Sequence, residues 1–511
     1  MKSYANFLLN ISFVAAFAPP HRHIHNQNQQ YTWKLKSTTK NDSLPEGPTF
    51  FEALFGIALN GSPWEYMLRM KEKGYDGVVP VNLGIVGNYN FLLSPESVRA
   101  ATVEEAKILP RRFSVPLFEK LELDKGIVYE QGDRHKRNKR MCIPSFEQSQ
   151  SMESFVEATK AELDNLSSEF QSKASSQSNR ENVIDLYAEM RRSALNVVLD
   201  VSFGLGKEGA NNFESTDELS DTIAEYLERI VALANEIPPL WQVSPRLSYN
   251  YVRVTDVVLP KLRHLVSEVI EARRLEDEEA AKKRNRADLL GVLVEQVDDN
   301  NDIRAILFDV VIAGSDTTAS TATAALYLLH QNENRQWLER AREEASQTDG
   351  GRDIPLDKLR SQMPLSVGIA REVLRLYPPV PFVGRTATAS GSLLDGAYPV
   401  EPGDTFCFSP WFLGRDPSQW GENAAVFDPQ RWLDDPTNGG ASNNFSWLPF
   451  GAGSRGCLGT RLGLTEVTLS VARLLQDFEF EFENSGDLPV KYDLTLNLDG
   501  VMNCKIKNRI L

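Results

Sequence analysis

A helical repeat of unusual length runs from residue 301 to about residue 331 of this 511-residue chain. Its face toward the rest of the protein is predicted to carry Ile306, Val310, Ala313, Thr317, Ser320 and Ala324. Thirty helical residues extend about 45 Å, which is enough to cross a whole domain. The remainder of the chain must therefore pack around this helix.

The segments on either side also have mainly helical periods. Strand-like runs occur at residues 77–93 and, near the carboxyl end, at 478–482 and 492–507. The polar breaks between these elements are short, as in the surface loops of one domain. We therefore predict a mainly α fold with small β-sheets (α+β), formed as a single large domain by residues 44–511.

The amino-terminal segment differs in charge from the rest of the chain. The net charge is −15, yet residues 1–41 contain no Asp or Glu. Residues 1–16 read as a signal peptide, and the basic, hydroxyl-rich residues 17–43 read as a transit-peptide-like segment. The junction from Ala15 to Pro19 resembles that of plastid precursors in algae with complex plastids. A plastid location follows, with a secretory signal or an endoplasmic-reticulum anchor as the alternative.

Charge and cysteine usage exclude several classes of function. The acidic excess gives a nucleic-acid partner no electrostatic support. Cys142, Cys407, Cys457 and Cys504 lie far apart without a C-x-x-C pair, which argues against a disulfide framework and a zinc site. So few cysteines fit a reducing compartment.

One of these cysteines lies in a glycine-rich bend. The run from Phe450 to Gly459 contains four glycines and Cys457, and an amphipathic helix follows it. A thiolate at a helix amino terminus is stabilised by the helix dipole and by free amides, so we expect a lowered pKa for Cys457. Arg455 adds a cation to the same loop. A buried structural cysteine is the alternative for this residue.

The spacing Phe-x-x-Gly-x-Arg-x-Cys-x-Gly resembles the cysteine loop of the cytochrome P-450 family, the haem-thiolate mono-oxygenases. The resemblance covers essentially everything after residue 45. It implies haem b as the cofactor, held between the long helix and this loop, with Cys457 as the axial iron ligand. Arg455 would pair with a haem propionate, and Phe450 and Gly459 would also border the cofactor.

The long helix carries a second match, from Ala313 to Thr318. A glycine costs about 1 kcal/mol inside a helix, so Gly314 needs a reason. The resemblance implies that Ala313 and Gly314 leave room for dioxygen over the iron. It also implies that Asp316 and Thr317 form the catalytic acid–alcohol pair that delivers protons.

Further matches concern structure and cofactor binding. Glu372 and Arg375 are three residues apart on one predicted helix face, and Arg431 follows in a segment that resembles the third member of the family's Glu–Arg–Arg triad. These three are assigned a structural role in holding the cysteine loop. Arg385 matches the strand arginine that contacts the other propionate.

The chain departs from the family in the basic helix that normally contains Trp-x-x-x-Arg. His135 replaces the tryptophan and Lys139 replaces the arginine, so their propionate contacts would be weaker and Arg140 would substitute. Five Lys or Arg residues in seven positions, including Lys136 and Arg137, favour an acidic electron donor, a ferredoxin or a flavin reductase. A solvated helix face is the alternative.

These features predict a mono-oxygenase that hydroxylates a lipophilic substrate with dioxygen and two electrons. With the plastid address, the chain resembles the plastid carotenoid-hydroxylase branch, which implies ring hydroxylation of a carotene. Fatty acids, sterols and other isoprenoids are alternative substrates. A non-catalytic haem-binding or sensor protein and a cofactor-free α-rich scaffold are the rivals from other classes. The apolar residues 50–59 are the segment expected to make a peripheral membrane contact.

Overall fold

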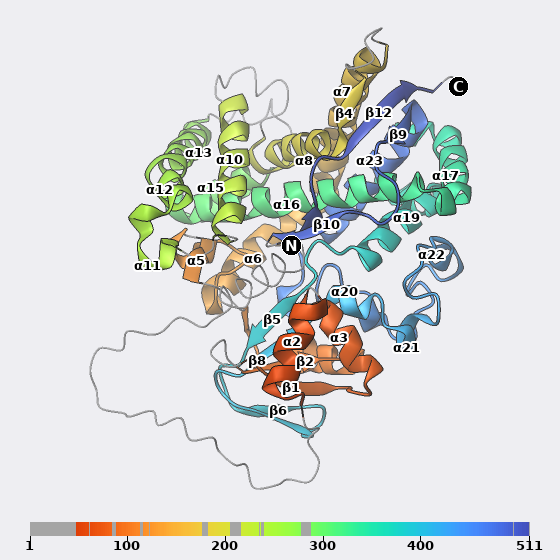
Figure 1. The fold of residues 1–511 in the computed structure, drawn as a ribbon. Coiled ribbons are helices and arrows are strands. Elements are labelled where there is room, and N and C mark those ends of the chain that lie inside the picture. The colour runs from red at the N-terminus through yellow and green to blue at the C-terminus, as the bar shows by residue number, and fades with distance from the viewer. Residues whose placement is uncertain are drawn as a thin grey trace.

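The computed structural model describes residues 47–509 except 61, 84–87, 113–115, 122, 176–181, 205–215, 235, 237–239, 277–287 and 494. The predicted signal peptide (1–16) and transit-peptide-like segment (17–43) lie outside these residues, so both stay predictions. Within the described residues the fold is mainly helical with several small sheets, as the sequence predicted (Figure 1).

The predicted long helix is α16 (Asn300–Leu329), which crosses the centre of the molecule in Figure 1. Its amino terminus is fixed by Asp299, whose side chain accepts a hydrogen bond from the backbone N–H of Asn301. The carboxyl-terminal half is almost completely buried, from Thr318 to Leu329. Its main packing partner is α8 (Leu186–Phe203).

Most of the other helices pack around α16 and α8 in one large apolar core. The longer ones are α6 (Gly132–Glu147), α7 (Ser149–Ala174), α10 (Thr216–Ala234), α13 (Leu259–Arg274), α17 (Arg335–Gln347), α19 (Pro364–Leu376) and α23 (Thr460–Asp477). The shorter ones in this core are α5 (Pro116–Lys120), α11 (Leu240–Val243), α12 (Tyr249–Arg253), α15 (Leu289–Gln296) and α18 (Leu359–Gln362). Outside it, α4 (Pro95–Arg99) and α20 (Pro410–Leu413) contribute to a second core, and α21 (Pro417–Trp420) and α22 (Gln430–Asp434) form a small cluster of tryptophans.

The largest sheet forms a second apolar core with α2 (Phe50–Asn60) and α3 (Pro63–Glu72). Its strand order is β1-β2-β8-β5-β3. The strands are β1 (Val78–Asn82), β2 (Asn88–Leu92), β8 (Thr405–Phe408), β5 (Val383–Thr386) and β3 (Arg111–Arg112). Only β2 and β8 pair in parallel, so separate parts of the chain meet here.

Three smaller sheets complete the fold. β4 (Val183–Asp185), β12 (Asn503–Asn508) and β9 (Phe478–Phe482) form one of them. The two hairpins are β6 (Gly391–Leu393) with β7 (Tyr398–Val400) and β10 (Val490–Asp493) with β11 (Thr495–Leu498). The strand-like runs 77–93, 478–482 and 492–507 all contain strands, which confirms that part of the prediction.

Glu372 and Arg375 of α19 form a fully buried ion pair, with 2.7 Å between Arg375 Nη2 and Glu372 Oε1. Arg375 also donates to the carbonyl oxygens of Gly414 and Val426, and Glu372 accepts from the indole of Trp432. Nε of Arg431 lies 3.5 Å from Glu372. The three triad residues therefore meet, and they fix the segment from 414 to 432 against α19.

Removing one partner of this pair should destabilise the protein strongly. Arg375→Ala leaves the Glu372 charge buried without its cation, at a cost of about 3–5 kcal/mol. Urea unfolding of the holoprotein measures this loss. Arg335→Ala, which breaks an exposed pair with Glu339 on α17, is the control and should leave the free energy of unfolding nearly unchanged. Equal effects of the two variants would contradict a structural role for the triad.

Candidate active site

The glycine-rich bend places Cys457 at the end of a tight turn that leads into α23. The backbone N–H of Cys457 donates to the carbonyl oxygen of Phe450 over 2.8 Å. Gly453 has φ +65, and a Cβ there would lie 2.1 Å from the carbonyl oxygen of Thr102. Only glycine fits this position, because both the backbone conformation and the close approach exclude a side chain.

Cys457 differs from the other three cysteines, which are all buried, in exposing its side chain. Protein atoms nevertheless surround it on many sides, and this desolvation raises the pKa of its thiol. The expectation of a lowered pKa was therefore wrong for the protein alone. The N–H of Gly459 and the cations of Arg112 and Lys139 oppose the rise but do not outweigh burial.

Several basic side chains gather beside this cysteine. Arg112 and Arg385 lie directly opposite each other on the antiparallel strands β3 and β5, where like charges repel. Arg455 and Lys139 extend the group, which we call the cation cluster (Arg112, Lys139, Arg385 and Arg455). Among the described residues, no carboxylate lies within ion-pair distance of any of the four.

The lowered pKa values of the groups in and next to the cation cluster show that holding these positive charges together is unfavourable. Burial, followed by the charges of Arg112 and Arg455, lowers the pKa of Arg385 to about 9. Burial and Arg112 lower that of Arg455 to about 10. His135 is buried next to the cluster, and desolvation and then Arg455 lower its pKa to about 3, so it is neutral. A cluster of this kind requires an anion.

Hydrogen bonds tie the cluster to the cysteine loop. Lys139 Nζ donates to the carbonyl oxygens of Ser454 and Gly456, over 2.8 and 2.7 Å. Arg112 Nη2 donates to the carbonyl oxygen of Arg455 over 2.7 Å. The Nε of Arg112 is buried and has no hydrogen-bond partner in the described part of the chain, which leaves a donor for a ligand.

Sequence reasoning selected His135, Lys139, Arg385 and Arg455 correctly as neighbours but missed Arg112. The only local signal was the doublet Arg111-Arg112 after Pro110, and its pairing with Arg385 comes from the sheet. Arg140 does not join the cluster. It is exposed, because a helix turns about 100° per residue and carries it off the face of α6 that holds Lys139.

On α16, the Ala313 side chain is exposed in the middle of the domain. The Thr317 hydroxyl donates to the carbonyl oxygen of Ala313 over 2.7 Å, and its oxygen keeps lone pairs to accept from another donor. Gly314 requires a correction, because a Cβ there would lie 2.9 Å from Val198 of α8. This glycine allows the two helices to approach, and its side-chain direction offers no room for dioxygen.

Asp316 points away from Thr317, toward α8 and β11. Its carboxylate accepts hydrogen bonds from the hydroxyls of Tyr187 and Thr495, over 2.9 and 3.2 Å, and lies 3.2 Å from Nε of Arg191. The acid and the alcohol are therefore adjacent in sequence but bound to different partners.

Asp309, one turn before Ala313, is a further buried acid that the sequence did not reveal. It accepts a 2.6 Å hydrogen bond from the N–H of Val128, and a Cβ on Gly126 would touch its carboxyl group. Burial raises its pKa to about 7, although Val128 and the Arg112 charge act against the rise. No motif marks it, since the residues that bury it are about 180 positions away.

An exposed cysteine beside basic side chains that have no carboxylate partner among the described residues defines a site for an anionic ligand. Comparison with known proteins identifies the class, since the Cytochrome P450 family profile matches residues 44–505. The chain belongs to the cytochrome P450 family. The family binds haem b through a cysteine thiolate and uses dioxygen, an organic substrate and an electron-transfer partner.

Individual relatives are plant proteins of low identity. LUTEIN DEFICIENT 5, chloroplastic, of Arabidopsis thaliana is 26% identical over 72% of this chain and 61% of that protein. Cytochrome P450 726A27 of Euphorbia lathyris is 25% identical over 92% of both chains. Drimenol monooxygenase of Persicaria hydropiper is 30% identical over 52% of this chain and 51% of its own. The alignments with LUTEIN DEFICIENT 5 and drimenol monooxygenase cover less than two thirds of the relative's own length, whereas the alignment with cytochrome P450 726A27 covers 92% of it.

The residues present fit haem b. The two haem propionates would neutralise Arg112, Arg385 and Arg455, which have no carboxylate partner among the described residues. Coordination to iron deprotonates a thiol outright, which overcomes the raised pKa of Cys457. Cys457 and Ala313 are both exposed, so each leaves a surface that a ligand can contact.

Loss of Arg112 should weaken cofactor retention. Arg112→Gln removes a charged donor, and hydrogen bonds to charged groups contribute about 1.5–3 kcal/mol, so haem dissociation should accelerate roughly 10- to 100-fold. Haem transfer to apomyoglobin measures the rate. Arg111→Gln, at the exposed neighbour, is the matched control and should behave like the parent protein. Unchanged retention in Arg112→Gln would show that this guanidinium holds no propionate.

Asp309 should make stability depend on pH. Its folded pKa, about 7, lies above the ordinary value of 3.8, so the folded protein keeps a proton that the unfolded chain has released. The free energy of unfolding therefore falls as pH rises from about 4 to 7. Asp309→Asn should remove this decline, on the order of 1 kcal/mol per pH unit. Urea unfolding of both proteins at pH 5 and pH 7 tests this prediction. An equal change in the free energy of unfolding between the two pH values for both proteins would contradict it.

Proposed function

We propose that Cys457 is the axial ligand of haem b and that the protein hydroxylates a lipophilic substrate with dioxygen and two electrons. One observation carries the proposal: the single exposed cysteine among four lies beside four basic side chains that have no carboxylate partner in the part of the chain that the structure describes. A structural cysteine would need neither the exposure nor the cations.

Each residue then has a defined task. Arg112, Arg385 and Arg455 bind the two propionates, and Lys139 holds the loop carbonyls so that the sulfur points at the iron. His135, neutral among cations, contributes a hydrogen bond instead of a charge. When bound, haem would activate dioxygen, which is the source of the oxygen atom that enters the substrate.

Proton delivery is assigned to Thr317 and Asp316. The Thr317 hydroxyl lies against the carbonyl oxygen of the exposed Ala313, where it could hold and pass on a proton. Asp316 is paired with Arg191, whose side chain is 39% exposed, so this pair connects the interior with solvent. Because the two side chains have separate partners, the relay requires Asp316 to leave Arg191 or a water molecule to bridge the gap.

For the substrate, we propose ring hydroxylation of a carotene in a plastid. The support is the plastid-type junction at Ala15 to Pro19 and the similarity to LUTEIN DEFICIENT 5, chloroplastic, whose name refers to a hydroxylated carotenoid. The similarity to drimenol monooxygenase supports other isoprenoids as alternative substrates. Fatty acids and sterols are further alternatives.

The central experiment separates these statements. The purified, reduced protein should give the carbon-monoxide difference spectrum of thiolate-ligated haem, and Cys457→His should lose it while Cys407→Ser, at a buried cysteine, keeps it. With β-carotene and a reducing system, hydroxylated carotenoid should form. A normal spectrum with no hydroxylated carotenoid would remove the carotene substrate, and a normal spectrum in Cys457→His would remove the whole assignment.

The proton-delivery assignment is tested on the same holoprotein. Thr317→Ala should keep the spectrum but consume oxygen with little product, while Ser320→Ala, one turn further along α16, should not. Equal product yield per oxygen in Thr317→Ala and the parent protein would exclude this role.

An acidic electron donor is proposed to dock on α6, a ferredoxin or a flavin reductase. Lys136, Arg137 and Arg140 are exposed on this helix, beside the cysteine loop that Lys139 contacts. We expect Lys136→Glu and Arg137→Glu to slow haem reduction by a plant-type ferredoxin on the order of tenfold at low salt, and less at high salt. Arg335→Glu on α17 is the control. Unchanged rates at low salt would discard this surface.

A peripheral membrane contact is proposed for α2. Phe51 and Phe55 are 65% and 52% exposed, and their rings stack with centroids 6.3 Å apart. No helix among the described residues has the length and apolar character to cross a bilayer. The proposed plastid location depends on the targeting signal read from residues 1–43. The endoplasmic reticulum is the alternative location.

A further inference from the structure

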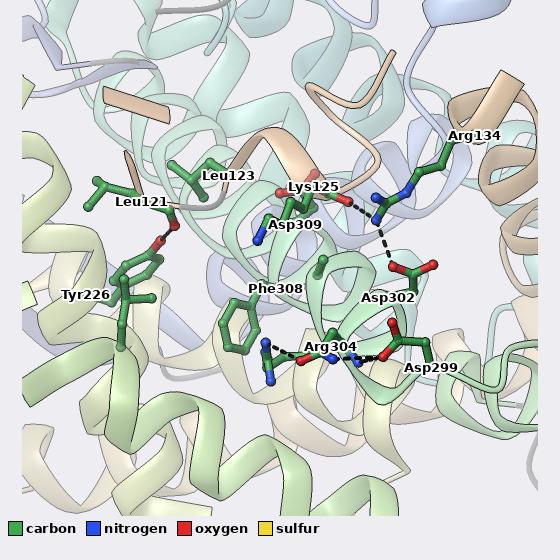
Figure 2. A pocket seen from close by; sticks show the side chains of 13 residues that line it. Leu121, Leu123, Lys125, Arg134, Tyr226, Asp299, Asp302, Arg304, Phe308 and Asp309 are labelled. Carbon is green, nitrogen blue, oxygen red and sulfur yellow. Dashed lines mark hydrogen bonds and ion pairs between the residues drawn. The ribbon is translucent and has the colours of Figure 1, made fainter. Parts of the chain in front are cut away.

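A cavity of about 420 Å³ lies beside the amino-terminal half of α16 (Figure 2). Pockets of a few hundred Å³ are typical of small-molecule sites. Residues from five parts of the chain line it: the segment 121–125, α6, α10, α13 and α16. None of the residues matched to the haem site is among its walls.

The walls divide into an apolar and a charged part. Figure 2 shows Leu121, Leu123 and Tyr226 on one side and Arg134, Asp299 and Asp302 on the other, with Phe308 and Asp309 of α16 between them. An amphipathic molecule would satisfy both parts.

The charged part of the cavity wall contains as many basic as acidic side chains, which restricts the charge of the ligand. Three basic side chains (Lys125, Arg134 and Arg304) face three acidic ones (Asp299, Asp302 and Asp309). Arg134 and Asp302 are paired at 2.9 Å, and Asp299 accepts from Asn301. Above pH 7, where Asp309 is ionised, no surplus charge is present, so an ionic head group would enter without compensation. A neutral hydroxyl can both donate to and accept from such walls.

The cavity lies at the start of a row of α16 side chains that leads toward Thr317. Ala305, Asp309, Ala313 and Thr317 are spaced four residues apart, so each lies one turn beyond the previous one, and the row winds about 40° around the helix with every step. Asp309 and Thr317 are separated by eight residues, or about 12 Å along the helix. Asp309 lines the cavity, and the charge of Arg112 in the cation cluster acts on it as well as on Cys457.

We propose that this cavity is a second substrate subsite, which takes the hydroxyl-bearing end of an elongated, neutral isoprenoid alcohol while its other end reaches Thr317. Asp309 is the group that binds the hydroxyl. This proposal rests on the function assigned to Cys457 and Thr317. It favours the isoprenoid alternative over a carotene, because a carotene has no hydroxyl for Asp309 to bind.

Equilibrium dialysis of the holoprotein with all-trans-retinol and all-trans-retinoate at pH 8 provides the test. The parent protein should bind the alcohol at least tenfold more tightly than the carboxylate. Ala305→Phe, which fills the cavity, should weaken retinol binding about tenfold or more, whereas Ala305→Ser should stay within about twofold. Ala305→Val, a smaller step, should give an intermediate loss if the phenylalanine variant does not fold.

The variant Asp309→Asn removes the charge that discriminates between head groups but leaves the shape of the cavity unchanged. The amide still accepts from Val128 and still binds a hydroxyl, so retinol affinity should change less than about threefold, but retinoate should bind about tenfold more tightly because the repelling carboxylate is gone. Equal affinity of the parent protein for both probes, or unchanged retinol binding by Ala305→Phe, would overturn the subsite.

Imidazole binding to the haem iron, followed by absorbance, distinguishes this failure from failure of the underlying function. If imidazole binds normally and retinol shows no selectivity, only the subsite is wrong. If imidazole fails to bind the parent protein, the haem assignment itself is wrong, and the subsite falls with it.

Discussion

The arrangement around Cys457 depends on a charge imbalance. Arg112 and Arg385 oppose each other across two strands, Arg455 and Lys139 lie beside them, and the carboxylates of the neighbourhood are engaged elsewhere. Glu130, for example, accepts from Asn138 and pairs with Arg134. Buried like charges destabilise a fold unless a ligand neutralises them. The protein is therefore built for an anion at this position, and a porphyrin with two propionates meets that requirement.

The segment from Gly126 to Gln131 connects the cation cluster with α16 through hydrogen bonds. Its Val128 N–H is held by Asp309 of α16, and its Glu130 carbonyl and Gln131 side chain accept from Arg455. One short stretch thus connects the central helix with the cysteine loop. The same acid borders the cavity beside α16, so the geometry of the cofactor site and the shape of the cavity are coupled through Asp309.

Much of the fold could be predicted because its signals are local. The helix from 300 to 329 follows from apolar periodicity, and the strands follow from short β-rich runs. Cys457 and Thr317 could be selected because each lies in a motif in which glycines, acids or hydroxyls stand where a structural role alone would not place them. Arg112 and Asp309 carry no such motif, and their importance arises from partners more than 170 residues away.

The sequence by itself determined the class of the protein, the loop that carries the sulfur and the helix that faces it, because backbone turns and helical periods depend on neighbouring residues. Only the tertiary structure decided which charges meet. It moved Arg140 away from the cluster, brought Arg112 into it, turned Gly314 toward Val198 and separated Asp316 from Thr317. Electrostatic and packing energies depend on distances in space, and no spacing along the chain fixes those distances.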